Sequence, residues 1–164
     1  MTVRLEILPA AAWASAVAAE LIRVLRERPG LRLCLPTGAT PTPLYATLVA
    51  AEARGEVSFG AATIVMRDEW VGLPTGGPAR CDVRLHGELL DRLRVPPAAV
   101  MTIYVDGPDP DAAAARHDEA ARGLDLALQG LGMNGHVGFN EPGSRPGDRT
   151  RLVRLALSSR QAAV

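Results

Sequence analysis

The stretch "LRLCLPTGATPTPLY" (residues 31–45) decides the fold of this chain. Its apolar first part, residues 31–36, is typical of a buried parallel strand, which reads as a continuous hydrophobic run. The small polar loop "TGATP" follows, and we expect a helix over about residues 41–54. Pro41 suits the start of that helix, because the N–H that proline lacks would be unpaired there anyway. The stretch therefore predicts a strand, a short loop and a helix in succession.

The same unit recurs along the chain. Helices are expected at residues 10–28, 82–94 and 110–122, and another begins near Arg160. Further strands are expected at residues 3–8, 61–66, 100–105, 124–132 and 149–159. This alternation predicts an α/β fold with an open, mainly parallel sheet and helices on both faces, a Rossmann-like three-layer αβα arrangement. Without repeats or low-complexity linkers, residues 1–164 are expected to form a single domain.

Composition excludes several classes of function. The 164 residues include 18 basic and 18 acidic side chains, a balance that argues against nucleic-acid or membrane-surface binding. Every basic residue is Arg, which excludes Schiff-base catalysis by a lysine of this chain and a Walker A phosphate loop. The N-terminus does not resemble a signal peptide, and no window has the apolar length of a membrane span. We expect a cytoplasmic protein that acts on a small molecule.

Several side chains are expected to be structural. Two cysteines are too few for a disulfide framework, and Cys34 lies in the apolar run as a buried hydrophobe. Trp13 falls on the apolar face of the first helix, whereas His86 and His117 fall on helices among charged neighbours and are expected to be solvated. Arg149, Arg151 and Arg154 alternate along the last expected strand and would share an exposed face.

Three loops that follow expected strands carry candidate functional residues. In the first, Thr37, Gly38, Ala39 and Thr40 are small enough for their backbone N–H groups to surround an anion at a helix N-terminus. A plain N-cap by Thr40, which requires no ligand, is the alternative. The phosphate interpretation predicts a phosphorylated small molecule as the ligand.

The second loop, "MRDEWVGL", places adjacent carboxylates Asp68 and Glu69 at the end of an apolar strand. In extended backbone their side chains point in opposite directions, so only one is expected to face a given cleft. A carboxylate there can act as a general base, and the alternative is an ordinary solvated turn.

The third loop, "GLGMNGHVGFNEPGS" (residues 130–144), gathers Asn134, His136, Asn140 and Glu141 among five glycines. Its alternative role is a polar loop that caps its own backbone. In a parallel sheet the carboxyl ends of the strands lie at one edge, so all three loops are expected to meet in one crevice. One site explains the three loops better than three coincidences.

The stretches "LPTGATPTPLY", "RDEWVGLP" and "LGMNGHVGFNEPG" resemble the three motifs of the glucosamine-6-phosphate deaminase family, in the same order and approximate spacing. The likeness covers nearly the whole chain and extends to connecting features such as "RGEVSF". Two details are closer to the galactosamine-6-phosphate deaminase/isomerase branch: "DEWV" together with "GPARC", and Asn134 where the glucosamine-type enzymes have Asp.

The resemblance implies an aldose-to-ketose isomerisation coupled to loss of ammonia from C2 of an amino sugar 6-phosphate. By matching position, Asp68 would move the proton between C2 and C1, and His136 would assist opening of the pyranose ring. Glu141 would orient or tune His136, and the loop from Thr37 to Thr40 would hold the 6-phosphate. No metal or organic cofactor is implied, and related hexameric enzymes suggest a possible homo-oligomer with an effector site near Arg149.

Two departures from the family pattern bear on this implication. Asn134 can offer His136 only a neutral hydrogen bond, where an Asp would stabilise an imidazolium by its charge. Family members also continue further, and their later part supplies basic residues that help to hold the phosphate. We therefore expect a fold that lacks its C-terminal part.

Three other functions remain open. A 6-phosphogluconolactonase would use the same phosphate loop, with His136 activating water. The stretches "FNEP" and "DEWVGL" argue against this function. A sugar-phosphate sensor would need a DNA-binding segment, for which the first expected strand leaves no room. A truncated, non-catalytic paralogue would bind the sugar phosphate without turnover. The sequence does not distinguish the two C4 epimers of the substrate.

Overall fold

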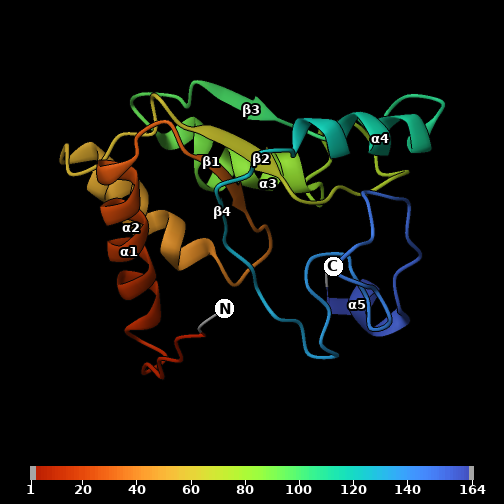
Figure 1. Cartoon of the computed structure of the whole chain (residues 1–164), viewed down its shortest axis with the longest axis horizontal. Helices are drawn as coiled ribbons and strands as arrows, with labels where there is room; N and C mark the ends of the chain where they lie inside the picture. The colour runs from red at the N-terminus through yellow and green to blue at the C-terminus, as the bar shows by residue number, and fades with distance from the viewer. Residues whose placement is uncertain (1–2, 163–164) are drawn as a thin grey trace.

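A computed structural model describes residues 3–162 of the chain. Its centre is a four-stranded sheet made of β1 (Arg32–Leu35), β2 (Thr63–Met66), β3 (Ala99–Met101) and β4 (Leu126–Ala127). The strand order is β3-β2-β1-β4, and every neighbouring pair is parallel (Figure 1). The predicted α/β class with an open parallel sheet is confirmed.

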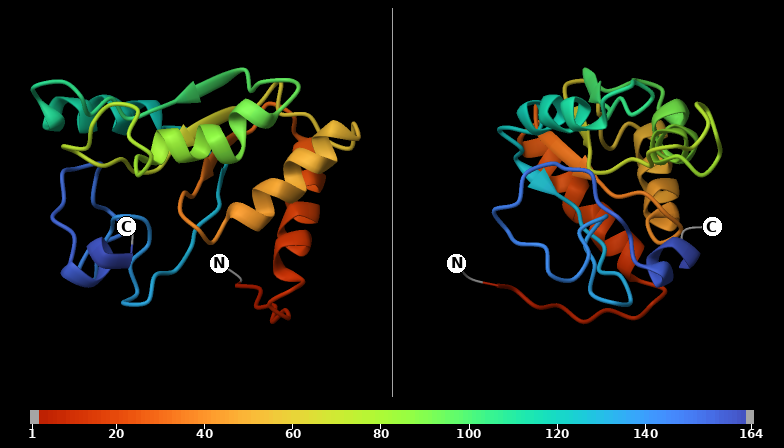
Figure 2. Two further views of the ribbon diagram at one scale, coloured as in Figure 1. Left: turned by 180° about the vertical axis from the view of Figure 1, so that it is seen from behind. Right: turned by 90° about the vertical axis from the view of Figure 1, so that its right-hand side faces the viewer.

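Helices connect the strands. α2 (Thr42–Ala53) joins β1 to β2, and α3 (Cys81–Glu88) joins β2 to β3. Right-handed crossovers place α2 and α3 on one face of the sheet, because both connections step in the same direction across it. The connection from β3 to β4 runs back in the opposite direction, so its helix, α4 (Pro110–Ala120), belongs on the opposite face. In the left view of Figure 2, α3 lies in front of the strands. α1 (Trp13–Glu27) packs against α2.

The hydrophobic core lies between the sheet and helices α1 to α3. Apolar side chains of β1 and β2, such as Leu33 and Ile64, are fully buried there with Leu44 and Leu48 of α2. Trp13 packs partly buried against this cluster, and Cys34 is buried without a disulfide partner, as predicted. Every member of the core cluster falls between Ala18 and Leu93.

The strand predicted at residues 3–8 is absent. Val3, Leu5 and Ile7 are 85%, 83% and 87% exposed, and this segment pairs with none of the described strands. Apolar and polar residues alternate in this segment, but alternation alone does not make a strand. A strand also needs a neighbour that accepts and donates its backbone hydrogen bonds.

The strand predicted at residues 149–159 is also wrong. Backbone groups there bond to side chains instead: Thr150 donates its N–H to Asp118, and Ala156 donates to Glu141. Residues 151–156 are irregular, and helix α5 (Leu157–Ala162) begins before Arg160. Arg149 and its alternating neighbours therefore do not share a strand face.

Other elements are shorter than predicted. The helix expected at residues 82–94 ends at Glu88 and continues as a 3-10 turn, Leu90–Arg92. The buried carboxylate of Glu52 accepts the backbone N–H groups of Arg94 and Val95, which takes both residues out of the helix. β3 and β4 keep only three and two residues of the longer predicted strands.

Candidate active site

Asp68 lies two residues beyond the end of β2, an interior strand of the sheet whose last three residues are buried. Its side chain is 8% exposed, and Oδ2 accepts a hydrogen bond from Arg67 Nε at 3.0 Å. An exposed turn is therefore not the environment of this carboxylate. A nearly buried carboxylate with one oxygen bonded and one oxygen without a protein partner among the described residues can act as a base.

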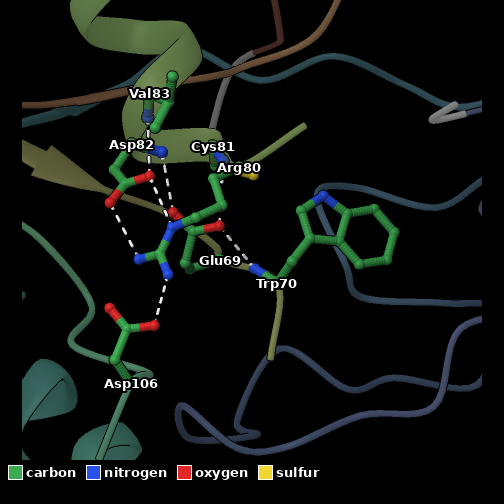
Figure 3. Close-up of polar contacts among 7 residues, drawn as sticks. All are labelled: Glu69, Trp70, Arg80, Cys81, Asp82, Val83 and Asp106. Atoms are coloured by element: carbon green, nitrogen blue, oxygen red, sulfur yellow. Dashed lines mark hydrogen bonds and ion pairs between the residues drawn. The ribbon is translucent and has the colours of Figure 1, made fainter. Parts of the chain in front are cut away.

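Glu69 serves a different purpose from its neighbour (Figure 3). Its carboxylate accepts the backbone N–H groups of Trp70 at 2.7 Å, Cys81 at 3.0 Å and Asp82 at 2.8 Å. These bonds tie the end of β2 to the first turn of α3, where backbone donors lack partners within the helix. Burial raises the pKa of Glu69, and the three N–H donors act in the opposite direction.

A second set of ion pairs holds the start of α3 in place. Arg80, only 3% exposed, donates to both carboxylate oxygens of Asp82 at 3.0 Å and to Asp106 at 2.6 Å (Figure 3). Asp106 lies in the connection from β3 to α4. The loops that follow β2 and β3 are thus linked through one buried guanidinium. Sequence reasoning named Glu69 only as the neighbour of Asp68 and missed its structural role and Arg80, because the partners of both side chains are distant along the chain.

The loop with the histidine holds a chain of hydrogen bonds. Asn134 Oδ1 lies 2.7 Å from His136 Nδ1 and also accepts the His136 backbone N–H at 3.1 Å. Its amide Nδ2 donates to Glu141 Oε2 at 2.7 Å. Asn134 therefore lies between the imidazole and the carboxylate, and its amide connects Glu141 to His136 by hydrogen bonds.

Helix α5 completes this arrangement. Ser159 Oγ lies 3.3 Å from both His136 Nδ1 and Asn134 Nδ2. Hydrogen bonding from Ser159, supported by Asn134 and the Ala156 backbone, lowers the pKa of Glu141. Ser159 is a site residue that sequence reasoning missed, because it lies in a segment that was predicted to be a strand.

Glycine allows this loop to approach Asp68. At Gly138, where φ is +61°, an added Cβ would lie 2.8 Å from Asp68 Oδ2 and 2.5 Å from Arg67 Nε. Only a residue without a side chain fits such an approach. The structure therefore brings the loop of His136 directly against the Asp68 carboxylate, as the sequence predicted for loops at the carboxyl edge of the sheet.

The loop from Thr37 to Thr40 follows β1 at the same edge. Gly38 has a φ of +116°, which gives the loop its sharp turn. The alternative of a Thr40 N-cap is not supported, since Pro41 occupies the cap position of α2 and no side chain caps it. Burial raises the pKa of Cys81 to about 12, with the Thr37 hydroxyl opposing and Asp68 reinforcing the effect, so that both residues lie near Cys81.

A cavity of about 680 Å³ opens beside Asp68. Asp68 and Glu69 both border it, and the Glu69 carboxylate is bonded to the backbone N–H groups of Trp70, Cys81 and Asp82. The aromatic pair Trp70 and Phe139, with ring centroids 4.5 Å apart, forms part of its wall together with Asn140. Neither His136 nor the loop from Thr37 to Thr40 borders this cavity, so these candidate residues do not share it with Asp68.

His117 departs from its predicted exposure. It is 5% exposed on α4, bonded to the Met66 backbone, and burial lowers its pKa. His86 is partly exposed and lies 2.7 Å from Asp91. Within residues 3–162, no group of His, Cys, Asp and Glu side chains is arranged to hold a metal ion, and no helix is long and apolar enough to cross a membrane.

A family model described as glucosamine-6-phosphate isomerases/6-phosphogluconolactonase matches residues 8–155. A glucosamine-6-phosphate deaminase of Beutenbergia cavernae is 40% identical over 159 residues, which cover 94% of this chain and 61% of that protein. Glucosamine-6-phosphate deaminase 2 of Bacillus subtilis is 37% identical over 79% of this chain and 53% of its own. The chain thus spans less than two thirds of the length of these relatives.

Solved structures show the same relationship. A monomeric glucosamine-6-phosphate deaminase superposes with a TM-score of 0.89 at 28% identity, over 96% of this chain and 67% of that one. A 6-phosphogluconolactonase of Thermotoga maritima superposes with a TM-score of 0.63 at 21% identity, over 77% of this chain and 59% of its own, and shares the fold.

Proposed function

The chain belongs to the glucosamine-6-phosphate isomerase/6-phosphogluconolactonase family, and from this premise we propose that it deaminates a 2-amino-2-deoxyhexose 6-phosphate. The products are the ketohexose 6-phosphate and ammonia. The observation that carries the proposal is the contact at Gly138, which sets the loop of His136 against the Asp68 carboxylate. A carboxylate base and a loop that carries an imidazole offer the two kinds of proton transfer that the reaction requires.

Asp68 is the proposed base. In the open-chain aldose it takes the proton from C2 and returns it to C1, while O1 gains a proton and the amine nitrogen loses one, which leaves an imine at C2 and a hydroxyl group at C1. Water then adds to the imine carbon, and ammonia leaves to give the ketose. The side chain suits this role because it is 8% exposed, and the Arg67 bond to Oδ2 leaves Oδ1 for the substrate proton.

His136 is the proposed acid–base group for ring opening. An imidazole can both donate and accept a proton, so it can deliver one to the ring oxygen O5. Asn134 and Glu141 keep the ring in one orientation, since Asn134 Oδ1 lies 2.7 Å from Nδ1 and bonds onward to Glu141. Nε2, which has no hydrogen-bond partner among the described residues, is then the nitrogen proposed to exchange the proton.

Thr37, Gly38, Ala39 and Thr40 are the proposed phosphate-binding residues. The positive φ of Gly38 and the start of α2 at Thr42 support this assignment, because backbone N–H groups at a helix N-terminus attract anions. Neither a metal nor an organic cofactor takes part in the proposed steps. "DEWV" and Asn134 resemble the galactosamine-6-phosphate branch, whereas the relatives described above carry the glucosamine name, so the proposal includes both C4 epimers as substrates.

Release of ammonia by the purified chain tests the proposal, with galactosamine-6-phosphate and glucosamine-6-phosphate in separate reactions. We expect release from at least one sugar, and the faster reaction names the preferred epimer. The Asp68→Asn variant controls for spontaneous loss of ammonia. If neither sugar releases ammonia above the level of this control, the result contradicts the proposal for this chain.

A further inference from the structure

Arg67 has an unusual relation to the proposed base. Side chains of adjacent residues in a strand point to opposite faces, yet Arg67 Nε donates to Asp68 Oδ2 at 3.0 Å. The contact is possible because β2 ends at Met66, and the long arginine stem curls back over its neighbour. Both side chains are largely buried, at 15% and 8% exposed, so solvent screens this ion pair less than a surface pair.

The guanidinium of Arg67 has a second anchor. Its NH1 donates to Gln129 Oε1 at 2.6 Å, two residues beyond the end of β4. One planar group therefore joins the carboxyl ends of β2 and β4. Because a guanidinium is rigid, the two bonds fix its plane and so fix the oxygen that it holds.

The third side of the pair is closed by the loop that carries His136. An added Cβ at Gly138 would lie within 3.0 Å of Arg67 Nε and Cδ and of Asp68 Oδ2. The backbone of that loop therefore prevents the pair from moving outward. Arg67 therefore holds Asp68 Oδ2, and Gln129 holds Arg67. The loop that carries His136 lies against both Arg67 and Asp68.

From this geometry we infer that Arg67 is a positioning residue for Asp68, and that it selects the oxygen of Asp68 that exchanges protons with the substrate. The inference rests on the proposed function. Arg67 occupies Oδ2 and thereby directs Oδ1 to the reacting carbon. Gln129 contributes through Arg67, by keeping the guanidinium in one orientation.

Steady-state kinetics of ammonia release test this role in the full chain. Arg67→Met should lower kcat by about 10-fold to 100-fold with little change in KM, because a misplaced base slows the chemical step but does not bind the sugar. Arg67→Lys should recover part of kcat, since an ammonium supplies the charge but not both bonds. Gln129→Leu should cause a smaller loss. Arg122→Met removes an exposed arginine that pairs with Glu119 and is the matched control.

Two kinetic results would overturn the inference. If Arg67→Met lowers kcat no more than Arg122→Met, the guanidinium does not position the base. If it raises KM while kcat is unchanged, Arg67 binds substrate instead of acting through Asp68.

Thermal unfolding of Arg67→Met, Asp68→Asn and the double variant tests the coupling without any need for turnover. Because both single changes remove the same ion pair, the Tm loss of the double variant should fall short of the summed losses by about 2–4 °C. If the wild-type chain releases no ammonia from either sugar, the proposed function fails while this cycle still decides the link between Arg67 and Asp68. Additive losses would overturn the link.

Discussion

The two parts of the molecule differ in how they are held together. Between Trp13 and Ala120, strands and helices enclose a continuous hydrophobic core. From residue 128 to the end of the described chain, one short helix and an isolated bridge between Val137 and Asn140 are the regular structure, and Leu155 and Ser159 are the buried residues. Leu131 and Met133 of this second part are 80% and 103% exposed.

The proposed site is divided between these two parts. Asp68 belongs to the packed part, where Glu69 and Arg80 fix the loop around it through buried hydrogen bonds. His136 belongs to the loop-rich part, where side-chain hydrogen bonds to Asn134 and Ser159 replace a core. Burial thus positions Asp68, and polar contacts position His136. A substitution can disturb either form of support without the other.

The largest effect is expected at the base itself. Asp68→Asn keeps the size of the side chain but removes the carboxylate, so ammonia release should fall by roughly 10²–10⁴-fold. Calorimetric titration of Asp68→Asn with the sugar phosphate that the wild-type chain converts should show that binding is largely retained. Undiminished turnover would remove Asp68 from the mechanism.

The contrast in packing should appear in stability. Leu48 is fully buried on α2, so Leu48→Ala should lower the free energy of unfolding by about 2–5 kcal/mol. Leu131→Ala, in the loop-rich part, should change it by less than about 0.5 kcal/mol. Urea unfolding of both variants makes the comparison, and equal losses would show that the second part has more of a core than its exposure indicates.

The contact between the two parts can be disturbed at Gly138. Gly138→Ala forces a side chain into the left-handed region and against Arg67 and Asp68, at an expected cost of about 1–2 kcal/mol in unfolding free energy and a lower kcat. Gly130→Ala is the matched control, because nothing lies within 4 Å of its added Cβ and its φ is not positive. Loss of kcat in both variants alike would mean that general loop flexibility, and not this approach, supports activity.

The smallest effect concerns the pH dependence of the packed part. Burial lowers the pKa of His117 below its usual 6.5, so the folded chain binds this proton more weakly than the unfolded chain. Stability should therefore be lost as the pH falls from about 6.5 through the folded pKa, and should level off above that window. In His117→Gln this loss should be smaller when unfolding is followed from pH 7.5 to pH 5. An unchanged pH profile would exclude His117 as its source.

The sequence predicted the packed part well. Apolar runs such as "LRLCL" and "TIVM" and the helical spacing of Leu21 and Leu25 led to β1, β2 and α1, because burial of these side chains is a property of the runs themselves. The alternating patterns at both ends of the chain misled the prediction. A strand depends on a partner that no local pattern reveals, so Val3 and Leu152 stand exposed in irregular segments.

By itself, the sequence determined how β1 to β4 alternate with α2, α3 and α4 along the chain, and it placed the three polar loops after strands of a parallel sheet. It determined this much because strand direction and loop position follow from chain connectivity. Tertiary structure alone decided which atoms meet: Arg67 with Asp68 and Gln129, Glu69 with the start of α3, and Gly138 with the proposed base. Those contacts join residues as far apart along the chain as Arg67 and Gly138, and only the packed sheet edge brings them together.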